Sequence, residues 1–418
     1  MPLTLNVNSE IGQLEGVILH TPGAEVENMT PQTAQRALYS DILNLSIARK
    51  EYAQLRGVLE KVTKTYEIVD LLSDVLDNYR KRESLIGKVC ISEGAADYFD
   101  DLMEMQSGIL AKVLIEGVPA KINSLTSYLN DEYYALFPLY NFYFTRDASV
   151  TIGNNALICR MANKVRMRES LIMEAIFKDS ALFNCHIINA HEFHPENEHI
   201  YIEGGDLLIA RDDILLVGNG CRTSTLGIDL LITRLCKDNP VGKKHLIVQQ
   251  LPHSPESFIH LDMVFTLLDR DKCMVFKPFI HGDNQYRTVH ITIENGRVSK
   301  IRSVSNMLNA LKGLGMELEP ICCGGVADEW NQEREQWHSG ANFFAIAPGK
   351  VLSYARNIHT LEQMSKHGFE VIPAWDIIEG KKEIDSYKRC VITIDGSELP
   401  RGGGGARCMT MPLSRKSL

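Results

Sequence analysis

Cys408 occupies the setting in this chain that is most suggestive of chemistry, directly after the segment Gly402–Arg407, which begins with four consecutive glycines. A cysteine nucleophile needs a partner that favours its thiolate, room for a substrate and a proton carrier for the leaving group. Glycines let the backbone approach a ligand closely and adopt positive φ angles. The run therefore predicts an ordered loop around a nucleophile, and the alternative is a frayed tail.

A proton carrier and two carboxylates are available at other places in the chain. His260 and Asp262 stand two residues apart, and if their segment is a strand, both side chains point to the same face. Glu203 precedes a pair of glycines, another point where the main chain can approach a neighbour closely. These residue types suit a Cys/His hydrolase or transferase, and a binding protein is the alternative because composition alone does not show that they meet.

Two further motifs carry weaker signals. His191, His194 and His199 have spacings that resemble those of zinc ligands, but Pro195 interrupts the segment, so we predict a solvated loop. The glycine run is not followed by Gly-Lys-Ser/Thr, so it does not match a phosphate-binding loop. Neither motif predicts a metal or nucleotide site.

Composition narrows the class of protein. The formal net charge of −9 argues against a preference for nucleic acid or anionic membranes and is compatible with a small cationic ligand. We expect no secretory signal, because the N-terminus has neither a basic start nor an apolar core, and no run is long enough to span a bilayer. The ten cysteines include no CxxC pair, which is typical of free thiols in a reducing cytosol. A cytoplasmic protein is predicted, and a homo-oligomer stays an open alternative.

The elements that must position these residues show two kinds of sequence pattern. Strand-like runs bounded by Gly, Asn and Asp alternate with amphipathic helical segments over most of the chain, which predicts an α/β fold. Residues 70–135 instead have the pattern of consecutive helices with almost no strand signal. We therefore predict an inserted α-helical domain at 70–135 within an α/β catalytic domain formed by 1–69 and 136–418.

Three acidic residues recur at a regular interval. Asp147, Glu203 and Asp262 stand in or beside strand-like runs and are separated by 56 and 59 residues. A unit of that size holds about three strands and a helix, and repetition on this scale is typical of propellers and solenoids. The units are not visibly alike in sequence, so the spacing is a weak signal. It suggests that equivalent strand ends converge on one axis and bring the three carboxylates together.

The order of several motifs resembles that of arginine deiminases. The motifs are Phe144–Asp147, Glu203–Asp206, Arg222–Ser224, His260–Phe265, Ser339–Asn342 and Gly402–Arg415, and the resemblance extends over essentially the full length. Arginine deiminases belong to the guanidino-group-modifying, amidinotransferase-like superfamily. The resemblance implies a five-bladed, pseudo-symmetric α/β propeller of ββαβ modules (the pentein fold) with an inserted helical domain.

The resemblance also implies a reaction, the hydrolysis of L-arginine to L-citrulline and ammonia. Cys408 would attack the guanidinium carbon to give a covalent S-alkylthiouronium intermediate, and His260 would act first as acid and then as base. Asp147 and Asp262 would hold the terminal nitrogens, while Glu203 would hold Nε and assist His260. No metal or organic cofactor is expected, because the substrate carbon is already electron-poor.

Residues for the rest of the substrate follow from the same resemblance. Arg166 and Arg222 resemble the family's carboxylate-binding arginines, with Arg168 as a competitor for the role of Arg166. Asn141 and Phe144 are expected nearby in the pocket.

Three positions depart from the family's pattern. They are Ser40, where an acid is lost, Ser339, in a loop that usually reads Asn-Asp-Gly, and Gly403, where many members carry a gating arginine. With Gly403 at the gating position of the substrate pocket, the sequence leaves open whether Arg407 takes over gating.

Two other functions remain open on sequence alone. One is a related guanidino-modifying enzyme that acts on a methylated or otherwise modified arginine, on agmatine, or by transfer of the amidino group. Retention of Arg166 and Arg222 argues against agmatine, which lacks the α-carboxylate. The other is a catalytically idle arginine-binding protein, which would have no need of a nucleophile.

Overall fold

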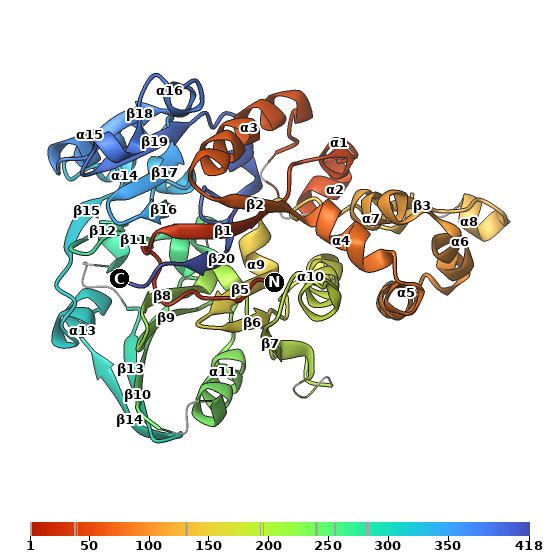
Figure 1. Ribbon diagram of the computed structural model, residues 1–418, viewed down its shortest axis with the longest axis horizontal. Coiled ribbons are helices and arrows are strands. Elements are labelled where there is room, and N and C mark those ends of the chain that lie inside the picture. Colours follow the sequence, from red (N-terminus) through yellow and green to blue (C-terminus); the bar gives the residue numbers. More distant parts are fainter. Residues whose placement is uncertain are drawn as a thin grey trace.

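The computed structural model describes residues 2–36, 39, 41–129, 133–192, 194, 196–238, 241–254, 256–280 and 285–418. In Figure 1 an α/β body holds the N-terminus near its middle and the C-terminus toward its left side, and a group of helices extends from the right. No helix in the described ranges is long and apolar enough to cross a membrane.

Five units with similar connections build the α/β body. In each, an antiparallel pair of strands is completed by a strand that lies parallel to one of the pair, and at least one helix connects them. The first two units are β5 (Ser149–Ile152), β6 (Asn155–Ile158), α10 (Met167–Asp179) and β7 (His186–Asn189), then β8 (Leu207–Arg211), β9 (Ile214–Asn219), α11 (Thr225–Asp238) and β10 (Lys243–Gln250). The short apolar runs form these strands because each is buried between its neighbours and the covering helices.

The third unit contains a hairpin that leaves its own sheet. The unit consists of β11 (Phe265–Asp269), β12 (Lys272–Val275), α12 (Lys277–Ile280), α13 (Met307–Gly313) and β15 (Glu319–Cys322). Between α12 and α13, the hairpin of β13 (Thr288–Glu294) and β14 (Arg297–Val304) pairs with β10, which extends the sheet of the second unit to five strands.

The last two units complete the body. The fourth consists of α14 (Glu329–Trp337), β16 (Phe344–Ala347), β17 (Lys350–Tyr354), α15 (Ile358–Lys366), β18 (Glu370–Pro373), α16 (Ala374–Ile378) and β19 (Cys390–Ile394). The fifth joins both ends of the chain, because β20 (Met411–Arg415) pairs with β1 (Leu14–Leu19), and β1 pairs with β2 (Lys64–Glu67) after α1 (Ala24–Glu27), α2 (Pro31–Arg36) and α3 (Leu45–Val62). In Figure 1 the first strands of the units lie near the middle and most helices lie outside.

The helical part between β2 and the first unit is more broken than the sequence pattern predicts. It contains α4 (Ile68–Leu76), α5 (Tyr79–Glu93), α6 (Phe99–Glu104), α7 (Ser107–Glu116) and α8 (Leu125–Tyr128), and a short antiparallel pair of β3 (Val118–Pro119) with β4 (Tyr134–Leu136). The side chain of Asn78 caps α5 and so separates it from α4. Leu72 of α4 and Ile172 of α10 belong to one continuous apolar core, so this part packs on the first unit.

Candidate active site

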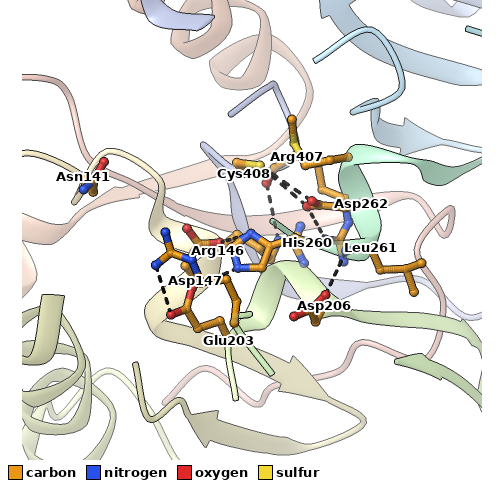
Figure 2. A network of polar contacts seen from close by, with 12 residues as sticks. Asn141, Arg146, Asp147, Glu203, Asp206, His260, Leu261, Asp262, Arg407 and Cys408 are labelled. Carbon is orange, nitrogen blue, oxygen red and sulfur yellow. Dashed lines mark hydrogen bonds and ion pairs between the residues drawn. The ribbon is translucent and has the colours of Figure 1, made fainter. Parts of the chain in front are cut away.

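The first strand of each unit is preceded by a short turn, and these turns carry the predicted site residues. Asp147 lies in the single-turn helix α9 (Thr145–Ala148), directly before β5. Glu203 precedes a one-turn 3₁₀ helix before β8, and Cys408 lies shortly before β20. The intervals of 56 and 59 residues in the sequence are therefore the lengths of structural units. Figure 2 shows the predicted catalytic set grouped around one point: Cys408, His260, Asp147, Glu203 and Asp262.

His260 lies between two of the predicted carboxylates. Its Nε2 is 2.9 Å from Oε2 of Glu203, and its Nδ1 is 3.8 Å from Oδ1 of Asp147. Burial alone would lower the pKa of His260, but the charge of Asp147 and the hydrogen bond with Glu203 raise it to about 9. At neutral pH the imidazole is therefore protonated and can serve as an acid.

The prediction that His260 and Asp262 share one strand face is wrong. Leu261–Met263 forms a 3₁₀ turn that begins directly after His260, so the period-two rule of a strand does not apply. Oδ1 of Asp206 accepts a hydrogen bond from the Leu261 backbone N–H at 2.9 Å and holds this turn. As a result, His260 faces Glu203 while Asp262 faces Cys408.

The paired glycines beside Glu203 have a steric reason. A Cβ on Gly205 would lie 2.5 Å from Nδ1 of His260, so the imidazole can occupy its place only beside a glycine. Glu203 itself is fully buried, with Nη1 of Arg222 3.7 Å from its Oε1. Burial alone would raise the pKa of Glu203, but Arg222 and His260 lower it to about 2. Glu203 is thus an anion that supports the imidazolium.

Cys408 is buried next to an aspartate. Its Sγ lies 3.7 and 3.9 Å from the two carboxylate oxygens of Asp262 and 3.2 Å from Nδ2 of Asn342. Burial and the charges of Asp262 and Asp147 raise the pKa of the Cys408 thiol well above its usual range. In the free protein the sulfur is therefore a thiol, and a cation placed among the carboxylates would favour the thiolate.

Arg407 lies behind Cys408 and is not among the residues that line the cavity, so it does not take the gating position. Its Nη1 donates to Oδ2 of Asp262 at 2.8 Å, and its Nε and Nη2 donate to the two oxygens of Glu10 at 3.1 and 3.0 Å. The side chain is 1% exposed, so its charge acts on the buried carboxylates and not on solvent. Glu10 was not predicted as a residue of this site, because none of the recognised motifs includes it.

Arg166 and Arg168 point in different directions. Nη1 of Arg166 donates to Oδ2 of Asp147 at 2.8 Å, while its Nε and Nη2 contact the carboxylate of Glu169. Arg168 instead donates to Oε2 of Glu93 at 3.1 Å and to the carbonyl oxygen of Phe137. The structure therefore places Arg166 beside the predicted catalytic residues and Arg168 against the helical part.

A small cavity joins most of the predicted residues. Its volume of about 20 Å³ is enough for roughly one water molecule. Its walls are formed by Asn141, Phe144, Asp147, Arg166, Arg222, Ile259, His260, Gly402, Gly403, Gly404 and Cys408. Glu203 and Asp262 stand behind this wall and contact residues that line it.

One group of side chains has the geometry of a metal site. Ligand atoms of Asp147, Glu203 and His260 lie within 4.8 Å of one another. Nη1 of Arg166 is 2.8 Å from Asp147 and 4.0 Å from Glu203, so a metal cation would share its ligands with a guanidinium. A metal ion at this place would therefore compete with the Arg166 guanidinium for both carboxylates.

Comparison with known proteins identifies the family. The arginine deiminase family model matches residues 35–415. The chain belongs to the arginine deiminase family. The arginine deiminase of Bacillus cereus is 34% identical over 434 residues, covering 99% of each chain, and that of Borrelia duttonii is 33% identical, covering 99% of this chain and 98% of the relative.

A solved structure shows the same mixed α/β fold. The N-terminal domain of ArgZ, covalently bound to a reaction intermediate, superposes with a TM-score of 0.52 at 13% identity, covering 96% of this chain and 98% of that chain. The likeness at this identity concerns the fold alone.

The three departures from the arginine deiminase pattern have different settings. Ser40 lies outside the described residues. Ser339 is buried with a φ of 59°, a left-handed conformation that the family's aspartate adopts more readily than serine. Gly403 lines the cavity with a φ of 84°, and a Cβ there would meet nothing within 4 Å. The space beside Gly403 is therefore open.

Proposed function

We propose that this member of the arginine deiminase family hydrolyses L-arginine to L-citrulline and ammonia. The observation that carries the proposal is the buried Cys408 thiol beside two carboxylates and an imidazolium, in a cavity that also holds two arginines. Carboxylates suit the guanidinium end of the substrate, and arginines suit its α-carboxylate.

In the first half-reaction, Cys408 becomes the nucleophile as the substrate binds. The arginine cation lies beside Asp147 and Asp262 and lowers the pKa of the thiol, whose proton leaves to solvent. The thiolate then forms a C–S bond with the guanidinium carbon. His260 gives its proton to the departing nitrogen, the C–N bond breaks, and ammonia leaves a cationic S-alkylthiouronium with a neutral imidazole.

In the second half-reaction, the same histidine works in the opposite direction. Neutral His260 takes a proton from water while the water oxygen bonds to the thiouronium carbon. The C–S bond then breaks, Cys408 leaves as thiolate and citrulline forms. The proton lost from the new carbonyl oxygen is taken up by ammonia in solution, so arginine cation and water give citrulline and ammonium. Because Nε2 of His260 is held by Glu203, we assign both transfers to Nδ1.

The cavity must open for this reaction, because arginine is far larger than about 20 Å³. The segment Gly402–Gly404 forms part of the wall and has no side chains to move aside. We assign entry of the substrate to a displacement of this segment. Arg166, Arg222, Asn141 and Phe144 are the proposed partners of the amino-acid end, and Gly403 replaces a gating side chain.

The finer architecture belongs to the same proposal. The five similar units support a five-bladed ββαβ propeller around the reaction centre. The helices α4 to α8 support an inserted helical domain at 70–135, with 1–69 and 136–418 as the catalytic domain.

The cellular setting is also proposed. All ten cysteines are free, which supports a reducing, cytoplasmic location. The proposal includes both a monomer and a homo-oligomer.

The test is citrulline and ammonia formation by the purified protein from L-arginine, with agmatine and dimethylarginine assayed in parallel. We expect turnover of arginine and its loss, by at least about a thousandfold, in Cys408→Ser. Cys236→Ser, a half-buried thiol on α11, is the matched control and should keep wild-type activity. Wild-type protein that makes no citrulline would refute the proposed reaction, and an active Cys408→Ser variant would refute the nucleophile.

A further inference from the structure

The turn before the first strand of the fourth unit carries a polar residue whose part in the reaction the family resemblance does not specify. The other four units contribute Asp147, Glu203, Asp262 and Cys408 from the corresponding turns. In the fourth unit Asn342 stands two residues before β16, and its side chain is 1% exposed. All five units thus send a polar side chain to one place.

Asn342 contacts both the sulfur and the backbone of the nucleophile. Its Nδ2 lies 3.2 Å from Sγ of Cys408 and 3.2 Å from the carbonyl oxygen of Asp262. Its Oδ1 accepts hydrogen bonds from the backbone N–H groups of Arg407 at 2.9 Å and Cys408 at 3.4 Å. Sδ of Met263 is 3.7 Å from Nδ2.

These partners determine which end of the amide faces the sulfur. Two backbone N–H groups need an acceptor, so the oxygen of Asn342 must face Arg407 and Cys408. The carbonyl oxygen of Asp262 needs a donor, so the nitrogen must face the opposite way, and its second N–H is aimed at Sγ. A flipped amide would lose three hydrogen bonds.

We propose that Asn342 is a catalytic residue that donates a hydrogen bond to the Cys408 thiolate during both half-reactions. The inference rests on the proposed covalent function and adds a group that stabilises the sulfur anion when it forms and again when it leaves. A hydrogen bond to a charged acceptor is stronger than one to a neutral thiol, so the contact favours the thiolate.

The charged surroundings explain why a neutral donor is suited to this place. Asp262 and Asp147 oppose the thiolate, and the charge of Arg407 favours it. The imidazolium of His260 and the arginines Arg166 and Arg222 line the same cavity, and the buried hydroxyls of Tyr143 and Tyr354 also lie near the sulfur. A lysine or arginine in direct contact with the sulfur would repel the cationic substrate. An amide stabilises the anion without adding charge to the pocket.

Alkylation of Cys408 by iodoacetamide, followed by mass spectrometry of its peptide, measures the thiolate without substrate. We expect Asn342→Ala and Asn342→Asp to slow this alkylation about tenfold to a hundredfold at a given pH and to move its pH profile upward. The kcat for arginine should fall by a similar factor, with KM changed less than about threefold. Asn342→Asp keeps the acceptor for the two backbone N–H groups, so it remains decisive if the alanine variant does not fold.

Asn357→Ala is the matched control, because Asn357 is equally buried in the same unit and donates to the carbonyl oxygen of His338 instead. It should alkylate at the wild-type rate. Wild-type alkylation in both folded Asn342 variants, or a loss confined to KM, would overturn the inference. A wild-type protein that makes no citrulline would refute the proposed function, whereas the alkylation profiles would still test the contact between Asn342 and the sulfur.

Discussion

Two buried arginine–aspartate pairs flank Cys408. One faces the cavity, and the other faces the scaffold behind it. Arg166 donates to Asp147 and Arg407 donates to Asp262, each at 2.8 Å. Arg166 lines the cavity, whereas Arg407 lies behind it. The same type of ion pair therefore faces the proposed substrate on one side and the scaffold on the other.

The difference lies in the third partner of each pair. Glu169, three residues after Arg166, also pairs with it. Oδ1 of Asp147 accepts no hydrogen bond from the described residues, so it is available to a ligand. Glu10 binds Arg407 from the N-terminal segment and so connects that segment to the residue before Cys408. A buried carboxylate without a full set of partners costs free energy, which is an arrangement typical of functional sites.

The largest expected effect concerns the scaffold pair. Arg407→Met should lower the free energy of unfolding by about 3–5 kcal/mol, because it leaves Glu10 and Asp262 buried without their common cation. Urea denaturation followed by circular dichroism measures this change. A loss below about 1 kcal/mol would mean that the Arg407 side is not the structural one.

The second largest effect concerns the pH dependence of stability, which should differ between the scaffold side, with Glu10, and the cavity side, with His260. Burial alone would raise the pKa of Glu10, but Arg407 and Arg146 lower it from 4.5 to about 2. A lowered acid pKa stabilises the fold fully above about 4.5, and that stability is lost as the pH falls through about 2. On the cavity side, the raised pKa of His260 stabilises the fold below 6.5, and this is lost as the pH rises through about 9.

Each of these two contributions is on the order of 3 kcal/mol, at about 1.4 kcal/mol per pKa unit. Unfolding free energies measured in urea between pH 3 and pH 10 should therefore fall toward both ends. Glu10→Gln should reduce the loss of stability in acid, leaving the part due to Glu203, whose pKa is also lowered to about 2, and should leave the alkaline side as in wild type. An unchanged acid side in that variant would assign the acid loss to other carboxylates.

The smallest expected effect concerns substrate affinity on the cavity side. Arg222→Met should raise the KM for arginine about tenfold to a hundredfold, since it removes a proposed partner of the α-carboxylate. For agmatine, which has no carboxylate, KM should change little. Arg168→Met is the control, because Arg168 contacts Glu93 and Phe137 away from the cavity. Equal changes of KM for both substrates in Arg222→Met would contradict the proposal that Arg222 binds the α-carboxylate.

Features that depend on residues close together in the sequence could be predicted from it. The glycines before Cys408 and after Glu203 indicated close approaches, and the regular spacing of the three acids indicated repeated units. The sequence was less informative about turns, because one 3₁₀ turn at Leu261–Met263 cancels the strand rule that would have aligned His260 with Asp262. The β13–β14 hairpin, which joins the sheet of the preceding unit, had no sequence signal of its partner.

By itself, the sequence determined the family, and it predicted the proposed reacting residues and their places along the chain. Only the tertiary structure decided which of them touch. The pairing of Glu10 with Arg407, the choice of Arg166 over Arg168 and the direction of the Asn342 amide all depend on segments that are distant in sequence. The physical reason is that a buried polar group takes its partner from whatever the fold brings within about 3 Å, and no local pattern contains that information.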